Sequence, residues 1–188
     1  MHFTVTRAAL APDLARALID GQREAMRPFG IDHIVHGEIW PEAYLVAAES
    51  EPGRPVAGLR LEQRTADHRL PLERALALPD ETQAKLDQRT AAGIVELCGL
   101  WVAQPAPERD LGDRLVRLGL AVAAAEGLAH VVAFGGQHSL PLALRTGFHF
   151  EGGEPVFPYP DPRYQSRLVW QRLPAPTDVS HPSQRSSP

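Results

Sequence analysis

The sequence contains little of what several classes of protein require. Cys98 is the only cysteine, which excludes an internal disulfide, and its place inside an apolar run predicts a buried side chain. The formal net charge is -4, so no overall positive field favours nucleic acid. No apolar run is long enough to span a bilayer, and residues 1–10 lack the features of a secretion signal. We therefore expect a cytoplasmic protein that binds neither nucleic acid nor a membrane.

The remaining composition is typical of a globular domain. Hydrophobic residues make up 44% of the 188 residues, which is enough for a sizeable core. From Pro174 onward the composition changes to Pro, Ser, Thr and Gln, which bury too little apolar surface to order themselves. We predict a single domain over residues 1–173 and a disordered tail over residues 174–188. The histidines and the cysteine form no H-x-x-x-H or C-x-x-C pattern, so we expect no metal.

Hydrophobic periodicity predicts a protein of mixed α and β structure. Residues 31–41 have no clear period and are predicted to be a surface loop, with the lining of a substrate groove as the alternative. Alternating or apolar runs predict strands, and amphipathic stretches with start and stop signals predict helices. The expected strands cover residues 2–6, 43–48, 56–61, 94–102, 131–134, 148–150 and 167–173. The expected helices begin near Pro12, at Pro79 with Asp80 as a cap, at Leu111, and near Ser139.

The apolar strand 94–102 leads through a short polar link into the amphipathic helix that begins at Leu111. A strand, helix, strand order requires a right-handed crossover, so strands 94–102 and 131–134 should be parallel. The unpaired N–H groups of the first turn of a helix bind phosphate readily. This turn is therefore a candidate anion site.

This order of elements resembles the GNAT superfamily of acyl-CoA-dependent acyltransferases over residues 3–173. In that family a strand that ends in valine reaches a [QR]-x-x-G-x-[GA] loop. Here Val102 leads without gaps to Gly112 at the second glycine position, and Arg109 matches the usual basic residue. The resemblance implies an α+β fold with α/β/α layers. Its mixed sheet would have about seven strands, a splayed parallel fourth and fifth pair, and flanking helices.

The resemblance also implies acyl-CoA, in the simplest case acetyl-CoA, as a co-substrate. Two positions depart from the motif, because Asp110 replaces the first glycine and Pro107 the leading Gln or Arg. An aspartate adds bulk and like charge beside a phosphate and can itself cap the helix. Arg109, Arg114 and Arg117 either offset this charge or form a solvated face. The implied donor-binding residues are Leu100, Trp101, Val102, Arg109, Leu111, Gly112, Asp113 and Arg114.

Glu96 is a carboxylate inside an otherwise apolar strand. An unpaired buried carboxylate is costly, so Glu96 must face solvent, a partner or a cleft. It occupies the position at which histone-type GNAT enzymes, which the chain resembles here, keep a general base. We predict that role for Glu96, because an amine must be deprotonated to attack a thioester. A structural salt bridge with Arg60 is the alternative.

The general acid of the family is a tyrosine four residues before a Gly-Phe pair. Gly147 and Phe148 match that pair, but the tyrosine position holds Ala143. His138 or Ser139, at the start of the same predicted helix, are therefore our candidates for protonating the thiolate. The late loop holds two further tyrosines that the sequence does not place: Tyr159 and Tyr164.

The long connection over residues 65–93 and the string GLRL at residues 58–61 are similar to acyl-homoserine-lactone synthases and N-acyl amino acid synthases. That branch can take acyl chains from acyl carrier protein. The leading prediction is transfer of an acetyl group from acyl-CoA to an amine of a small molecule or peptide. The alternatives are a donor with a long acyl chain, on CoA or acyl carrier protein, and a catalytically silent module that senses a ligand or binds a partner. The sequence leaves a homodimer open.

Overall fold

A mixed six-stranded sheet forms the centre of the protein in the computed structural model, which describes residues 1–35, 37–106 and 108–174. The strands lie in sequence order, and every neighbouring pair is antiparallel except the parallel pair β4 and β5. The strands are β1 (His2–Arg7), β2 (Tyr44–Glu51), β3 (Arg54–Gln63), β4 (Ile94–Val102), β5 (His130–Gly135) and β6 (Arg167–Arg172). The predicted parallel pair is thus confirmed.

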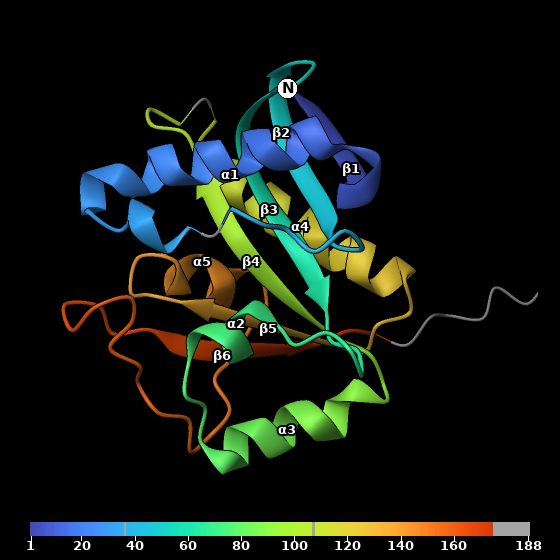
Figure 1. The fold of residues 1–188 in the computed structure, drawn as a ribbon, viewed down its shortest axis with the longest axis vertical. Coiled ribbons are helices and arrows are strands. Elements are labelled where there is room, and N and C mark those ends of the chain that lie inside the picture. Colours follow the sequence, from blue (N-terminus) through green and yellow to red (C-terminus); the bar gives the residue numbers. More distant parts are fainter. Residues whose placement is uncertain (36, 107, 175–188) are drawn as a thin grey trace, which may run out of the picture.

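Helices cover both faces of this sheet, which confirms the predicted α/β/α layers (Figure 1). One face carries α1, α2 and α3, and the other carries α4 and α5. The helices are α1 (Pro12–Met26), α2 (Pro71–Ala75), α3 (Asp80–Thr90), α4 (Leu111–Ala125) and α5 (Leu140–Arg145). Three short 3-10 helices are η1 (Ala8–Leu10), η2 (Arg27–Phe29) and η3 (Asp32–Ile34).

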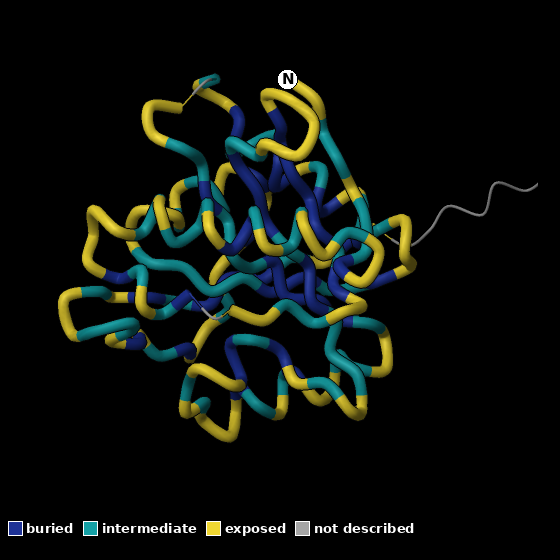
Figure 2. Tube along the Cα trace, turned by 45° about the horizontal axis from the view of Figure 1, so that its top comes forward, coloured by how far each residue is buried: buried dark blue, intermediate teal, exposed yellow. Residues whose placement is uncertain are grey.

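The central strands are buried because both of their faces are covered. In β2 the buried run extends over residues 45–49, and the dark tube of Figure 2 follows the sheet through the middle of the molecule. Helix α4 contributes Leu111, Leu115 and Val116 to one side of this core. Leu115 follows Leu111 by four residues and Val116 comes directly after it, so the three side chains lie on the same side of the helix, as the amphipathic pattern predicts.

Helix α1 crosses β4 at very close range. A Cβ atom at Gly21 would lie 2.2 Å from the ring of Trp101, so only glycine allows the helix to rest on this ring. Trp101 is buried there among side chains of α1 and β2. This contact fixes the end of β4 against the end of α1, and both border the site described below.

Two predictions about individual elements are wrong, and one helix was not predicted. Residues 148–150 form no strand; His149 makes one isolated bridge to Trp170, on the side of β6 that faces away from β5. The chain then turns away at residues 152–153, so no second pair forms. The long connection contains α2, a five-residue helix that the sequence did not predict. Asp80 is the first residue of α3 rather than its cap, which is Pro79.

The predicted tail lies outside the described residues from position 175 onward. Within the described part of the chain, every helix is too short or too polar to cross a bilayer.

Candidate active site

The parallel strands β4 and β5 separate partway along their length. Their pairing runs from Ile94 opposite His130 to Leu97 opposite Ala133, and β4 continues to Val102 without a β5 partner. A β-bulge bends β4 at this point, because Leu59 of β3 faces two residues of β4, Gly99 and Leu100. Gly99 has a φ of +63°, in the left-handed region that glycine tolerates best. The bulge and the separation together open the sheet.

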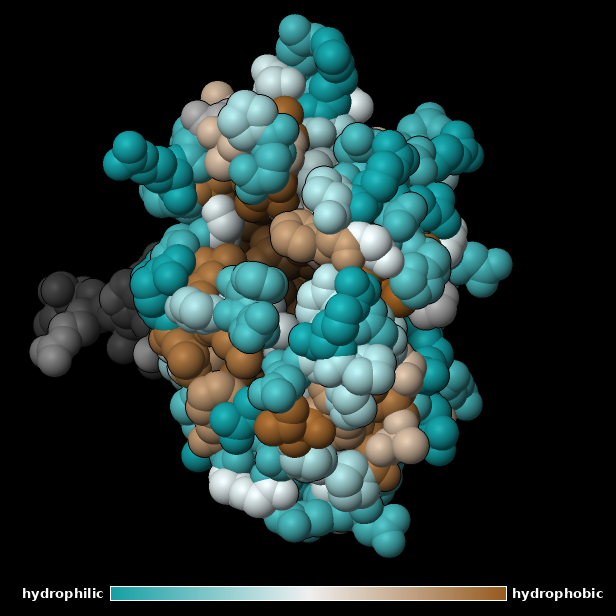
Figure 3. All heavy atoms as spheres, turned by 90° about the vertical axis from the view of Figure 1, so that its left-hand side faces the viewer, coloured by the Kyte–Doolittle hydropathy of each residue, from teal (hydrophilic) through white to brown (hydrophobic). Residues whose placement is uncertain are grey.

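A cavity of about 300 Å³ lies in this opening and reaches both faces of the sheet. Figure 3 shows a hollow with hydrophobic walls on the side of the molecule that is at the left of Figure 1. On one face of the sheet the end of α1, the 3-10 helices η2 and η3, and the loop around Tyr159 surround the cavity. On the other face α4 and α5 surround it. The cavity therefore contacts both helical layers through the opening in the sheet.

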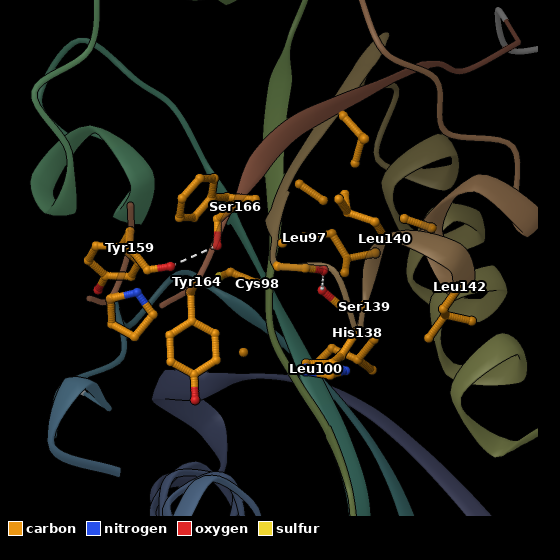
Figure 4. A pocket seen from close by; sticks show the side chains of 18 of the residues that line it. Leu97, Cys98, Leu100, His138, Ser139, Leu140, Leu142, Tyr159, Tyr164 and Ser166 are labelled. Carbon is orange, nitrogen blue, oxygen red and sulfur yellow. Dashed lines mark hydrogen bonds between the residues drawn. The ribbon is translucent and has the colours of Figure 1, made fainter. Parts of the chain in front are cut away.

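Few polar side chains border this cavity, and most of them are already hydrogen-bonded (Figure 4). The Ser139 hydroxyl donates to the carbonyl of Gly136 at 3.1 Å. The Ser166 hydroxyl donates to the carbonyl of Tyr159 at 2.8 Å, and Tyr164 donates to a carbonyl of η2 at 3.1 Å. The three hydroxyl protons are thus held by the protein itself.

His138 and Ser139, the predicted general acids, are exposed residues at the edge of this cavity. The His138 ring lies 6.1 Å from the ring of Phe29, so it is close to η2 across the opening. The structure therefore places both candidates beside the cavity. His138 is the better proton donor of the two, because the Ser139 hydroxyl proton is engaged by Gly136.

Cys98 also lines the cavity. Burial raises the pKa of its thiol well above the usual value. A thiol that stays protonated is a poor nucleophile. Cys98 is thus a wall of the cavity rather than a reactive group, as its apolar neighbours in the sequence predict.

Glu96 is buried, and its side chain lies outside the cavity lining. Its Oε2 atom accepts a hydrogen bond of 2.8 Å from the backbone N–H of Leu72, in the first turn of α2. Burial and, to a smaller extent, the negative charge of Glu62 together raise the pKa of Glu96 to about 8, against the opposing effects of the Leu72 hydrogen bond and two nearby arginines. At neutral pH the group is mostly protonated. Direct contact between Glu96 and a substrate in the cavity does not follow from this geometry.

Glu62, which the sequence analysis did not single out, faces Glu96 from β3. Its carboxylate accepts hydrogen bonds from Arg60 at 2.8 Å, from Arg74 at 3.1 Å, and makes a 3.1 Å contact with His68 Nε2. Arg60 therefore pairs with Glu62, and the predicted alternative of an Arg60–Glu96 salt bridge is not formed. The signal was present in the sequence, because Glu62 is also a carboxylate in an apolar strand.

Tyr159 is a cavity residue whose pKa is affected by Glu96. It lines the cavity, and its pKa is raised by burial and by the negative charge of Glu96. Cys98 shares both properties, because it also lines the cavity and the negative charge of Glu96 contributes to its raised pKa.

The start of α4, the predicted anion site, differs in detail from expectation. Asp110 occupies the N-cap position, but its side chain makes no capping hydrogen bond. Its φ and ψ of -102° and 10° are far from the extended conformation that directs a cap oxygen to the first N–H groups. The prediction that Asp110 caps these groups is wrong, because its side chain makes no hydrogen bond to them. Pro107 lies outside the described residues.

The charged residues of this first turn are mostly paired with the protein. Asp113 accepts a hydrogen bond from Arg145 of α5 at 3.0 Å. Arg114 forms an ion pair with Glu108 and lies 4.7 Å from the centre of a β1 phenylalanine ring. The exposed Arg109 is thus the more available of the predicted phosphate contacts here.

The other predicted donor-binding positions fall into two groups. Leu100 lines the cavity, and Gly112 lies where α4 approaches α5, with a Cβ placed there 3.2 Å from Leu142 and 3.8 Å from Val102. The side chains of Trp101 and Leu111 point into the core instead. In the described residues, no group of three or more His, Cys, Asp or Glu side chains is arranged to hold a metal ion.

The fold matches solved structures of acyl-CoA N-acyltransferases. An acyl-CoA N-acyltransferase from Pseudomonas aeruginosa matches with a TM-score of 0.59 and 16% identity, over 90% of this chain and 98% of that one. A CoA-dependent acyl-homoserine lactone synthase, BjaI, was solved with SAM and isopentyl-CoA. It matches with a TM-score of 0.62 and 16% identity, over 92% of this chain and 83% of that one. NAA60 of Arabidopsis thaliana, solved with a bisubstrate analogue, matches with a TM-score of 0.56 and 12% identity, over 93% of this chain and 99% of that one.

No protein-family model and no curated protein sequence matches the chain. The structural similarity, together with the sheet order and the parallel β4–β5 pair, shows that the chain has the GNAT fold. This confirms the predicted fold class. The sheet has six strands where about seven were predicted.

Proposed function

We propose that the protein is an acyl-CoA-dependent N-acyltransferase. The observation that carries this proposal is the cavity where β4 and β5 separate, in a fold whose solved examples include acyl-CoA N-acyltransferases. BjaI was solved with an acyl-CoA, and NAA60 with a bisubstrate analogue, which supports a thioester donor and an amine acceptor. The acceptor is a small-molecule or peptide amine.

The thioester of the donor would lie at the β4 bulge, beside Gly99 and Leu100. A bulge leaves backbone groups unpaired with the neighbouring strand, and such groups can polarise a thioester carbonyl. The amine nitrogen forms a bond to the acyl carbon, the carbon–sulfur bond breaks, and the thiolate leaves. One proton leaves the amine, and one proton returns to the thiolate. Holding both reactants in one apolar cavity would supply much of the rate.

The proton transfers would use groups at two sides of the cavity. Glu96 is the proposed base, and it would act through Tyr159 or a water molecule because its carboxyl is outside the lining. His138, at the edge of the cavity, is the proposed proton donor for the thiolate. Glu96 belongs to the paired part of β4, and His138 to the segment that follows β5.

Phosphate binding would fall to the start of α4. The side chain of Asp110 makes no hydrogen bond to the first-turn N–H groups, and Gly112 adds no side chain there. The residues present therefore fit a CoA pyrophosphate, although Asp110 still places a negative charge nearby. That charge, together with Ala143 in place of tyrosine, supports the alternative of a silent ligand-sensing module.

Calorimetry with CoA and acyl-CoA thioesters tests the proposal, followed by release of free CoA in the presence of a panel of amines and amino acids. We expect saturable binding and amine-dependent CoA release. A protein that binds no thioester at millimolar concentration, on CoA or on acyl carrier protein, is not an acyltransferase of this type. Binding without turnover of any amine would support the silent module.

A further inference from the structure

The cavity has a side that the proposed donor elements leave free. Helices α4 and α5, where the donor is proposed to bind, lie on one face of the sheet, and the end of α1, η2, η3 and the loop before β6 lie on the other. In Figure 4, Tyr159 and Tyr164 of that loop lie across the cavity from Leu142 of α5. We call this second side the acceptor side. Its larger side chains are Met26, Phe29, Ile31, Ile34, Tyr159 and Tyr164.

The lining of the cavity lacks side chains that could pair with a charged acceptor group. Among the described residues, no Asp, Glu, Lys or Arg side chain borders the cavity. Arg60 lies behind the lining, where its Nη1 atom is 3.5 Å from the amide oxygen of Gln22 and its Nε atom donates to Glu62 at 2.8 Å. Glu62 thus already compensates the charge of this arginine. His138, at the edge of the cavity, is assigned to the thiolate.

This environment selects acceptors by their charge. Transfer of an ion from water to an apolar site is strongly unfavourable unless a partner compensates its charge. The reacting amine escapes this cost, because an apolar site lowers its pKa and favours the neutral form, which is also the nucleophile. A carboxylate, a phosphate or a second ammonium group on the same molecule adds its own cost, and the reaction gains nothing from making it neutral. The acceptor side therefore disfavours every charged group except the amine itself.

Aromatic rings make up much of the acceptor side. Phe29 belongs to η2, and the Tyr164 hydroxyl donates to its backbone carbonyl at 3.1 Å, which joins the loop before β6 to η2. The Tyr159 ring lies 5.6 Å from the ring of Phe134, which also lines the cavity. Aromatic rings attract further rings in offset or edge-to-face arrangements, beyond the effect of the buried area. These rings therefore favour an aromatic acceptor over an aliphatic one.

On the basis of the proposed function, we infer that the acceptor is a primary amine on a short carbon chain that ends in an uncharged aromatic ring and carries no other charged group. The amine nitrogen bonds to the acyl carbon, the carbon–sulfur bond breaks, the amine loses one proton and the thiolate gains one. The products are free CoA and a neutral N-acylated aralkylamine. The N-acyl amino acid synthases that the chain resembles imply an amino acid as acceptor, and the inferred acceptor differs from it by the missing carboxylate.

Steady-state kinetics with matched acceptors tests this inference, with acetyl-CoA and octanoyl-CoA as donors. Phenethylamine, L-phenylalanine and L-phenylalaninamide share the ring and the amine, and only L-phenylalanine carries a carboxylate. At equal concentrations of the neutral amine, kcat/KM for L-phenylalanine should be at least about a hundredfold below that of the other two. Cyclohexylethylamine should be about threefold to tenfold below phenethylamine, because it lacks the aromatic ring. Putrescine, with two ammonium groups and no ring, should be no better than L-phenylalanine.

Two variants of partly exposed residues test the acceptor side itself, and thermal melts establish that they fold. Phe29→Ala should lower kcat/KM for phenethylamine about tenfold, mainly through KM. Phe150→Ala is its matched control, because Phe150 is also partly exposed and lies outside the lining, so it should change nothing. Met26→Arg adds a cation at the end of α1, where the helix dipole favours it, and should raise turnover of L-phenylalanine relative to phenethylamine at least about tenfold. Met26→Gln, of similar length and neutral, should not.

The outcomes distinguish this inference from the proposed function. Equal turnover of L-phenylalanine and L-phenylalaninamide, or faster turnover of putrescine than of phenethylamine, overturns the inferred acceptor and leaves the acyltransferase intact. Equal effects of Phe29→Ala and Phe150→Ala also overturn it, because the acceptor then lies elsewhere. Failure of every amine to release CoA from either donor removes the proposed function itself.

Discussion

Glu62 and Glu96 lie directly opposite one another on β3 and β4, and both carboxyl groups are buried. Like charges in this arrangement repel, so the pair is stable only when one member is neutral or neutralised. Arg60, Arg74 and His68 surround Glu62, whereas Glu96 has only the N–H of Leu72. Glu96 is therefore the protonated member of the pair at neutral pH.

The stability of the protein should depend on pH through Glu96. Its pKa rises from 4.5 to about 8 on folding, so the folded state holds a proton that the unfolded state releases between these values. The stabilisation is complete below pH 4.5 and is lost as pH rises through about 8. The free energy of unfolding falls by about 1.4 kcal/mol per pH unit between these values. Glu96→Gln should remove this dependence. Urea unfolding of both proteins across this range measures it.

The experiment compares the pH dependence of the unfolding free energy of wild type with that of Glu96→Gln. Wild type and Glu96→Gln share all other titrating groups, among them Glu62, Arg60, Arg74 and Tyr159, so only the difference between the two curves reports on Glu96. A difference in unfolding free energy that stays constant with pH would show that the pKa of Glu96 is not raised.

The reaction rate should rise with pH if Glu96 is the base. The ionised carboxylate is the active form, so kcat should increase about tenfold per pH unit below about 8 and level off above it. Glu96→Gln should abolish this rise, and Tyr159→Phe should lower kcat if the tyrosine connects Glu96 to the cavity. A Glu96→Gln enzyme with an unchanged pH profile would exclude the base role.

Loss of Arg60 should destabilise the protein strongly. Arg60→Met leaves the buried Glu62 with one hydrogen bond fewer and a less compensated charge, which costs roughly 3–5 kcal/mol in comparable buried pairs. The matched double variant Arg60→Met with Glu62→Leu removes both members of the pair. It should recover most of this loss, as measured by thermal or urea unfolding; no recovery would mean that the cost of Arg60→Met lies elsewhere.

The charge of Asp110 should weaken binding of CoA. Asp110→Gly removes bulk and charge, and Asp110→Asn removes charge alone. A unit charge about 4 Å from a phosphate in water costs about 1 kcal/mol, so both variants should bind CoA about fivefold more tightly at low salt. The side chain makes no capping bond, so stability should change little. An unchanged affinity in both would place the phosphates elsewhere.

The contact between α1 and β4 should tolerate no added methyl group. Gly21→Ala places a Cβ atom 2.2 Å from the buried Trp101 ring, so overpacking should cost about 1–3 kcal/mol despite the better helix propensity of alanine. Gly119→Ala is the matched helical control, because its Cβ meets Leu59 at 3.3 Å and the neighbour needs to move less. Thermal unfolding that ranks the two in the opposite order would contradict the packing described.

Local pattern determined the elements that this sequence forms. Alternation and three-to-four spacing of apolar residues placed the long strands and α1, α3 and α4, because these periods follow from backbone geometry alone. The strand, helix, strand order of β4, α4 and β5 determined that β4 and β5 are parallel. The predicted strand at residues 148–150 was wrong, because its apolar residues pack beside β6 without continuing the ladder.

Tertiary structure alone decided the site. The sequence identified Glu96 as an unusual carboxylate, but only the register of β3 against β4 places Glu62 opposite it and assigns Arg60 to Glu62. The cavity depends on the bulge at Gly99 and on where the β4–β5 pairing stops. These are properties of strand pairing between distant segments, and the local pattern of one segment carries no information about its partner's register.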